Sequence, residues 1–282
     1  MKTLCVCKTT YRLKSAVSLT VAVISDFHDI CYEPVVKMLR EDPPDVIAVV
    51  GDLFLGFKPK RNLSAFEIAE NVLPLLRVCV DIAPTVMSIG NHDWLLSEVD
   101  IQILKQMGVE VLHNEWKRYV VKDQEVLFGG LTSARVAEYW KCRKHFYLEN
   151  GYDDRYPDWD GNQWAKSVIL DSNWLSEFVK REGYKILLSH HPEYWAVKDP
   201  FLKEHKIDLV ISGHAHGGQI RFFNRGLWAS GQGWFPKYVR GLYQGEHGHM
   251  VVSTGMANTA RITPRLFNPP EIVYVALGDD KK

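Results

Sequence analysis

The sequence has no excess of either charge and no long hydrophobic run. Lys and Arg together number 34, and so do Asp and Glu. A formal net charge of zero excludes a globally basic surface that would hold nucleic acid, although it leaves room for a local basic patch. The longest apolar runs, such as Val46–Val50, have the length of a strand, whereas spanning a bilayer takes roughly 18–20 residues. We therefore expect no membrane anchor and no stable nucleic-acid complex.

The amino terminus lacks the pattern of a secretion signal, and cysteine is scarce. Lys8, Arg12 and Lys14 interrupt any apolar segment there. The five cysteines are an odd number without regular spacing, which argues against the disulfide framework of a small secreted domain. Cys5 and Cys7 could form half of a metal site, but no second pair completes it, and alternation on a strand explains their spacing. These features predict a cytoplasmic protein.

The composition and the hydrophobic pattern are those of a globular α/β protein. Of the 282 residues, 46% are hydrophobic and 24% are charged, which provides for a core and excludes a disordered chain. Near-continuous apolar segments predict strands of a sheet that is covered on both faces. These segments are residues 19–24, 45–50, 85–89, 185–188 and 208–211, with shorter β-like segments at 250–253 and 272–276.

Helical patterns lie between these strands. We predict helices that begin near Pro34, Ser64, Leu95 and Ser172. Proline is tolerated in a first helical turn, and Ser64 with Glu67 has the spacing of a capping box. Pro74 should kink or break the second helix.

Polar side chains follow five of the predicted strands. In α/β proteins, functional sites assemble at the carboxyl ends of strands. The residues found there, in chain order, are Asp26 and His28, then Asp52, then Asn91, His92 and Asp93, then His190, and finally His214 and His216.

These residue types are metal ligands. A mixture of carboxylate, amide and imidazole suits Mn, Fe, Zn or Co better than an all-oxygen Mg or Ca site. A lone Asp or Asn at a strand end is usually a turn former, and a lone His is usually an ordinary polar residue. Five such strand ends in one order favour a metal centre instead. Without His92 and Asp93 the set offers seven donors, which are too many for one tetrahedral ion and suit two ions that share a bridging carboxylate.

As a set, the motifs D-x-H, G-D, G-N-H-D, S-H and G-H-A-H-G-G resemble the calcineurin-like metallophosphoesterase superfamily, over about residues 19 to 220. Gly217-Gly218-Gln219 and the segment 268–272 resemble its bacterial branch of predicted phosphohydrolases. The resemblance implies a β-sandwich of two mixed sheets flanked by helices. It also implies a single domain over residues 1–282, with a variable insertion near 135–166.

The resemblance also implies a role for each polar residue. One ion would be held by Asp26, His28 and His216. The other would be held by Asn91, His190 and His214, with Asp52 bridging both. His92 would lie above the phosphate as a catalytic residue, with Asp93 orienting its ring, and His191 would not be a ligand. The two ions would be divalent or of mixed valence, with Mn favoured and Fe, Zn, Co or Ni as alternatives.

A site with two ions predicts a mechanism. A hydroxide that bridges them would attack phosphorus in a phosphodiester, a pyrophosphate or a phosphomonoester. The alternatives are a non-catalytic metal-binding scaffold of the same fold, a nuclease or a protein phosphatase. A dinucleotide-binding oxidoreductase is excluded, because residues 25–28 read S-D-F-H where a glycine-rich turn would be needed. The sequence carries no signal for an oligomeric state.

Two segments are candidates for selecting the substrate. The first is the insertion 135–166, where Arg143 and Lys144 with Arg135 could bind a second phosphate or form a solvated charged face. The second is the aromatic loop, residues 225–236, whose Trp228 and Trp234 could cover a substrate or pack against the domain.

Overall fold

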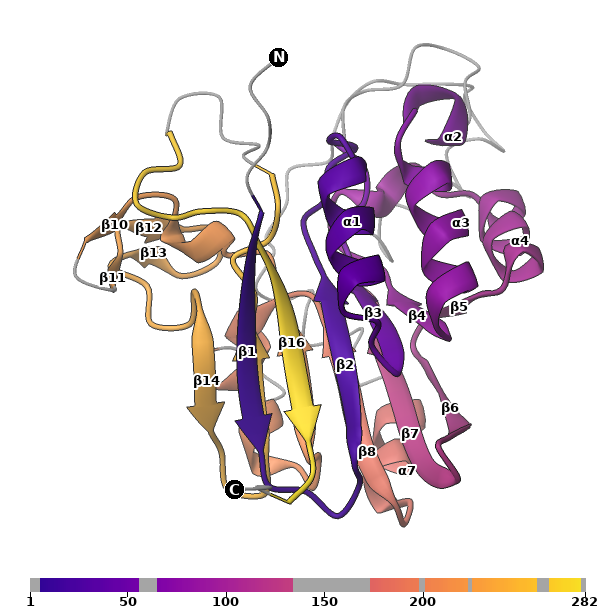
Figure 1. Cartoon of the computed structure of the whole chain (residues 1–282). Coiled ribbons are helices and arrows are strands. Elements are labelled where there is room, and N and C mark those ends of the chain that lie inside the picture. The colour runs from indigo at the N-terminus through magenta and orange to yellow at the C-terminus, as the bar shows by residue number, and fades with distance from the viewer. Residues whose placement is uncertain are drawn as a thin grey trace, which may run out of the picture.

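The computed structural model of the chain describes residues 6–55, 65–133, 173–197, 201–222, 225–257 and 264–279. In this part of the chain two six-stranded mixed sheets pack face to face, and helices lie outside them (Figure 1). The predicted α/β sandwich is therefore confirmed. The insertion 135–166 lies outside the described residues.

The first sheet combines strands from both ends of the chain. In spatial order it contains β1 (Cys7–Leu13), β16 (Glu271–Leu277), β2 (Leu19–Ile24), β3 (Val46–Val50), β4 (Thr85–Ser88) and β5 (Val109–Leu112). Strands β2 to β5 run parallel. Strand β16 pairs parallel with β1 and antiparallel with β2. The carboxyl ends of β2, β3 and β4 therefore meet at one edge.

The second sheet also has a parallel centre but places one antiparallel strand at each edge. In spatial order it contains β14 (Gly241–Gln244), β15 (His249–Val252), β9 (Leu209–Ser212), β8 (Tyr184–Ser189), β7 (Gln124–Leu131) and β6 (Glu115–Val121). The four inner strands are parallel, and both edge strands are antiparallel to their neighbours. Strands β8 and β9 thus also end side by side.

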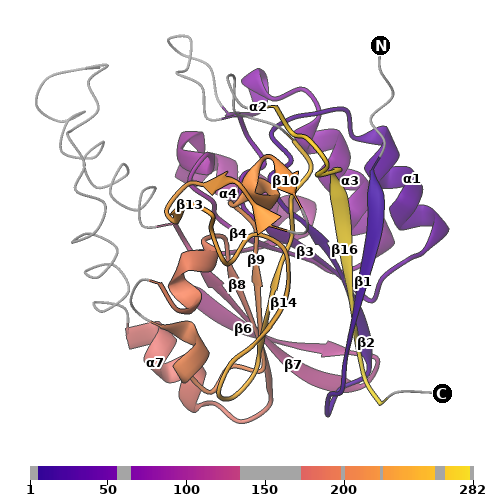
Figure 2. The ribbon, with the colours of Figure 1, turned by 90° about the vertical axis from the view of Figure 1, so that its left-hand side faces the viewer.

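Helices cover the outer face of each sheet (Figure 2). The first sheet carries α1 (Glu33–Glu41), α2 (Ala65–Ile68), α3 (Val72–Ile82) and α4 (Glu98–Met107). The second carries α7 (Asn173–Lys180). Short 3₁₀ turns follow β4 at η1 (Asp93–Leu95), β8 at η2 (Pro192–Trp195) and β9 at η4 (His216–Gly218), and η3 (Leu202–Glu204) precedes β9.

Each inner strand is buried on both faces, as its apolar pattern predicts. In β2, Val21 and Val23 face the core between the sheets, whereas Ala22 and Ile24 face the core beneath α1 and α3. Successive side chains of a strand point to opposite faces, so a continuous apolar run supplies both cores.

One helix begins later than predicted, and the break predicted at Pro74 is present. The helix expected from Leu95 begins at Glu98, because Ser97 caps it in a capping box with Asp100. The helix expected from residue 64 is broken before Pro74, into α2 and α3, and Pro74 lies in the first turn of α3, where its missing N–H costs nothing. Among the described residues, no helix is long and apolar enough to cross a membrane.

Candidate metal centre

The polar residues that follow the strands lie on strained turns. Asp26 and His28 follow β2, Asp52 follows β3, and His214 and His216 follow β9. All five have a positive φ, between 45° and 62°. Non-glycine residues adopt this left-handed conformation at a cost of about 1–3 kcal/mol each, and such strain clusters at functional sites.

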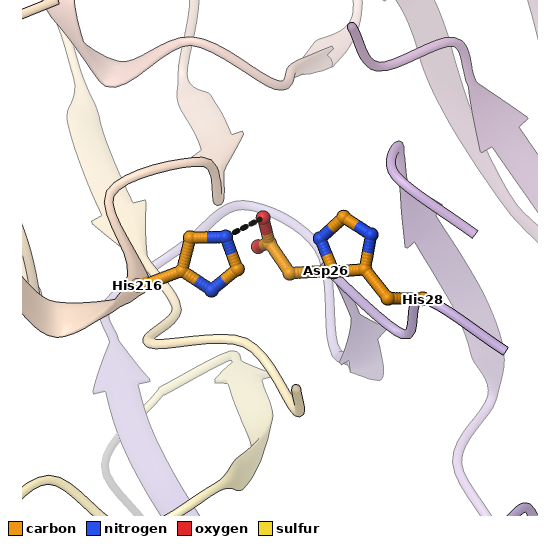
Figure 3. Close-up of side chains that lie close together, drawn as sticks. All are labelled: Asp26, His28 and His216. Carbon is orange, nitrogen blue, oxygen red and sulfur yellow. Dashed lines mark ion pairs between the residues drawn. The ribbon is translucent and has the colours of Figure 1, made fainter. Parts of the chain in front are cut away.

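The first cluster joins the two sheets. Asp26, His28 and His216 each place one ligand atom within 4.8 Å of the others, and all three are buried. Nε2 of His216 lies 3.5 Å from Oδ1 of Asp26 (Figure 3). The rings of His28 and His216 stack 5.4 Å apart. This is the set of three residues predicted to hold one ion.

The second cluster lies beside the first. Asp52, His190 and His214 are buried and place their ligand atoms within 4.8 Å of one another. Oδ2 of Asp52 lies 3.1 Å from Nε2 of His190 and 3.8 Å from Nε2 of His28 in the first cluster. This carboxylate therefore stands between the two clusters. Asn91 is also buried, on the turn after β4.

Three histidine rings turn Nε2 towards the clusters, because a main-chain oxygen occupies Nδ1 of each. Nδ1 of His28, His190 and His216 lies 2.7, 2.7 and 3.1 Å from the main-chain oxygens of Phe54, Val50 and Ala257, respectively. A carbonyl only accepts, so Nδ1 carries the proton in each neutral ring, and Nε2 keeps its lone pair. Such outer hydrogen bonds are typical of histidines that bind metals.

Four buried atoms at the centre make no hydrogen bond among the described residues: Nε2 of His28 and of His190, Oδ2 of Asp52, and Oδ1 of Asn91. Two of them, Nε2 of His190 and Oδ2 of Asp52, face each other as an ion pair at 3.1 Å. Unpaired buried polar atoms are costly and rare in folded proteins. All four can coordinate a cation, and the mixture of oxygen and nitrogen suits a divalent transition metal. The residues therefore fit the two ions that the sequence predicts.

The electrostatics of the centre favour a cation. Burial raises the pKa of Asp26 and Asp52, but the neighbouring histidines outweigh it and hold the pKa of both carboxyls below the ordinary value. Burial lowers the pKa of His28 to about 4. Burial also opposes protonation of His190, but Asp52 and Asp26 raise its pKa to about 10. At neutral pH a metal ion would take the place of the His190 proton.

Two glycines allow the backbone to approach these carboxylates closely. A Cβ atom on Gly90 would lie 2.3 Å from Oδ1 of Asp52, and one on Gly213 would lie 2.5 Å from Oδ2 of Asp26. Such distances are far shorter than a van der Waals contact, so a side chain at either position would displace the carboxylate.

The carboxylate of Asp93, which was expected to orient the ring of His92, contacts backbone N–H groups. Asp93 accepts hydrogen bonds from the backbone N–H groups of Asp52, Leu53, Phe54 and Gly90, and it is fully buried. Nδ1 of His92 instead lies 3.0 Å from the main-chain oxygen of Leu55. The carboxylate of Asp93 thus fixes the turns after β3 and β4 rather than the imidazole.

His92 itself lies beside the first cluster. Its ring meets the ring of His28 edge-on, with centroids 4.8 Å apart, and it is half-buried. Its backbone N–H donates to Oδ1 of Asp52 at 2.7 Å. The position leaves His92 at the boundary between the buried ligands and solvent.

A third group of ionisable residues adjoins the second cluster, and sequence reasoning did not single it out. His191, Glu193 and His214 place one ligand atom each within 4.8 Å of one another. Nε2 of His191 lies 2.8 Å from Oγ of Ser133. Burial raises the pKa of Glu193, but His214 and His191 outweigh it and lower that pKa to about 2. An acidic residue three positions after His190 was the only local signal.

The aromatic loop contains three short strands. The first, β11 (Arg225–Gly226), pairs with β10 (Arg221–Phe222) just before the loop, and β12 (Trp228–Ala229) pairs with β13 (Gly233–Trp234). Trp234 is 69% exposed and Phe235 is 73% exposed. Trp228, at 40% exposed, is more covered. Trp234 and Phe235 are therefore largely open to solvent, whereas Trp228 packs in part against the domain.

The comparisons with known proteins agree with this geometry. The profile of the calcineurin-like phosphoesterase family matches residues 19–218. A transmembrane protein with a metallophosphoesterase domain from Danio rerio is 29% identical over 194 residues, which cover 66% of this chain and 36% of that protein. The chain therefore spans little more than a third of that relative.

Bacterial relatives match over more of their length. The uncharacterized protein YpbG of Bacillus subtilis is 24% identical over 268 residues, which cover 94% of this chain and 83% of that protein. An uncharacterized metallophosphoesterase of Aquifex aeolicus is 25% identical over 87% of this chain and 77% of its own. Among solved structures, a dimetal phosphatase from Danio rerio is 13% identical with a TM-score of 0.46, and the match covers 93% of this chain and 94% of that one.

The match to the family profile and the clusters of buried ligands together define a class of enzyme, the metal-dependent phosphoesterases. Because the family profile covers well over half of its residues, the chain belongs to the calcineurin-like phosphoesterase family.

Proposed function

We propose that the protein hydrolyses a phosphodiester, pyrophosphate or phosphomonoester at a centre with two metal ions. Asp26, His28 and His216 hold one ion; Asn91, His190 and His214 hold the other; Asp52 bridges them. The observation that carries the proposal is the pair of adjacent buried clusters, whose ligand atoms include three that make no hydrogen bond, namely Nε2 of His28 and of His190 and Oδ2 of Asp52. Mn is the favoured metal, with Fe, Zn, Co and Ni as alternatives.

The ions would supply Lewis acidity, which activates water at neutral pH and offsets the charge on the phosphoryl group. The protein's own contribution is to fix the ligands. Main-chain carbonyls hold the imidazoles in one tautomer, and the backbone N–H of His214 donates to both oxygens of Asp26, at 3.2 and 3.1 Å. Such preorganisation spares the site any rearrangement when the substrate binds.

Metal-dependent turnover tests the function directly. The protein is stripped with a chelator, and release of nitrophenol from bis-p-nitrophenyl phosphate and from the monoester is followed with and without Mn²⁺. We expect turnover of at least one substrate only with the metal. The assay is repeated with Fe, Zn, Co and Ni. A protein that binds two ions but cleaves neither ester with any of these metals or with Mn would instead be the non-catalytic scaffold.

We further propose that His92 donates a proton to the leaving group or stabilises charge on the phosphoryl group. In His92→Ala, kcat for diphenyl phosphate, which has a poor leaving group, should fall by roughly a hundredfold or more, since general acid catalysis contributes that much. The loss should be much smaller for bis-p-nitrophenyl phosphate, because nitrophenolate leaves without a proton. Equal losses on both esters, at unchanged metal content, would exclude the role as an acid.

The remaining predictions concern the setting of the enzyme. We propose a small phosphate ester as substrate, no stable nucleic-acid partner, a cytoplasmic location and one domain over residues 1–282. The zero net charge supports the absence of a nucleic-acid partner.

A further inference from the structure

Glu193 contacts a histidine of the second cluster but is not one of the three residues that form it. Its Oε1 lies 3.4 Å from Nδ1 of His191 and 3.7 Å from Nε2 of His214. Its Oε2 is buried without a hydrogen-bond partner among the described residues. The rings of His191 and His214 are in contact, with centroids 4.2 Å apart. One buried carboxylate therefore faces both imidazoles.

The backbone holds Glu193 firmly in this place. It lies on η2, directly after β8, between Pro192 and two aromatic residues that belong to the outer core of the second sheet. Its main-chain oxygen accepts a hydrogen bond from the N–H of Val197 at 2.9 Å. The side chain therefore starts from a fixed point next to the second cluster.

We propose that Glu193 is a positioning residue, which binds the Nε2–H of His214 and the Nδ1–H of His191 and thereby presents Nδ1 of His214 to the second metal ion. This inference rests on the proposed function. The 3.7 Å separation is slightly longer than a hydrogen bond, and the inference is that the two groups close to hydrogen-bond distance around the bound ion. A histidine that binds metal usually donates its other N–H to such a carboxylate, which fixes the tautomer and the direction of the ring.

The aromatic loop supports Glu193 from the opposite side. Gly231 has a φ of +76°, and a Cβ atom there would lie 2.0 Å from Oε1 of Glu193. Gly233, two residues further on, has a φ of +78°, but a Cβ atom there would meet nothing within 4 Å. Alanine strains the backbone equally at both positions, yet only at Gly231 does it displace the carboxylate. The two glycines therefore form a matched pair for a test.

The test measures the affinity of each ion separately. Metal is removed with a chelator from four proteins: wild type, Glu193→Gln, Gly231→Ala and Gly233→Ala. Each is then titrated with Mn²⁺, and electron paramagnetic resonance distinguishes one bound ion from a coupled pair. In Glu193→Gln we expect the second ion to bind about 10- to 100-fold more weakly, while the first, at Asp26, His28 and His216, binds within about twofold of wild type. Gly231→Ala should behave in the same way, and Gly233→Ala should keep the coupled signal.

Three results would overturn the inference. The first is a Glu193→Gln variant that binds the second ion as tightly as wild type does. The second is a Glu193→Gln variant that loses affinity for both ions equally and has a lower Tm without metal. The third is a wild type that binds a third ion which Glu193→Gln does not bind, because Glu193 would then be a ligand. A wild type that binds no Mn²⁺ removes the proposed function, and this inference with it. A wild type that binds two ions, with a variant that binds them equally well, removes the inference alone.

Discussion

Asp52→Asn should reduce metal-dependent turnover by about a thousandfold or more. The substitution keeps the shape of the side chain and removes its charge. Oδ2 of Asp52 stands between His190 and His28, at 3.1 and 3.8 Å, so the lost charge is the one that both ions would share. Hydrolysis of bis-p-nitrophenyl phosphate at saturating Mn²⁺, with the metal content of each sample measured in parallel, tests this expectation.

Asp45→Asn is the matched control. Asp45 precedes β3, at the opposite end of the strand that carries Asp52, where it contacts Thr20 and Lys122 at 2.7 Å each. It lies far along the strand from the clusters, so turnover should stay within about twofold of wild type. If Asp52→Asn binds two ions and keeps more than a tenth of the wild-type rate, Asp52 does not bridge the ions.

Asp93→Ala should cost about 4 kcal/mol or more of the free energy of unfolding. Four backbone N–H groups of two turns lose their acceptor, and an unsatisfied buried donor costs roughly 1–3 kcal/mol. The cost is a property of the fold and not of bound metal, so it should appear in the chelated protein. Urea unfolding followed by circular dichroism measures it.

Asp100→Ala provides the comparison for this loss. Asp100 is also buried, but its carboxylate serves only the capping box of α4, with Ser97. Loss of a cap costs roughly 1 kcal/mol. If Asp93→Ala loses no more than Asp100→Ala, the carboxylate of Asp93 does not hold the two turns together, and its role in the site must be sought elsewhere.

The clusters could be predicted because each proposed ligand lies within a few residues of its own strand. Asp26 comes two residues after β2, and His190 directly follows β8. Parallel strands bring their carboxyl ends to one edge, so a local pattern in the sequence determines a long-range assembly. The inner strands were predictable because their side chains pack into an apolar core on each face of the sheet, which makes their sequences continuous apolar runs.

The roles of Asp93 and Glu193 could not be predicted, because they depend on contacts that no local pattern records. Asp93 contacts Leu53, 40 positions earlier in the chain, and Glu193 contacts His214 from another strand end. The start of α4 was a different kind of error. The residues of its capping box, Ser97 and Asp100, are visible in the sequence, but the apolar pattern from Leu95 took precedence over them.

The place of β16 has a consequence for the order of events during biosynthesis. Residues 271–277 fill the gap between β1 and β2, more than 240 positions away, and pair with both. Until the ribosome has released that segment, the nascent first sheet exposes two unpaired edges, one of them the apolar β2 that leads to Asp26. The strand that leads to Asp26 therefore gains its second neighbour only when the last strand has been synthesised, and until then its apolar edge is open to pairing with another chain.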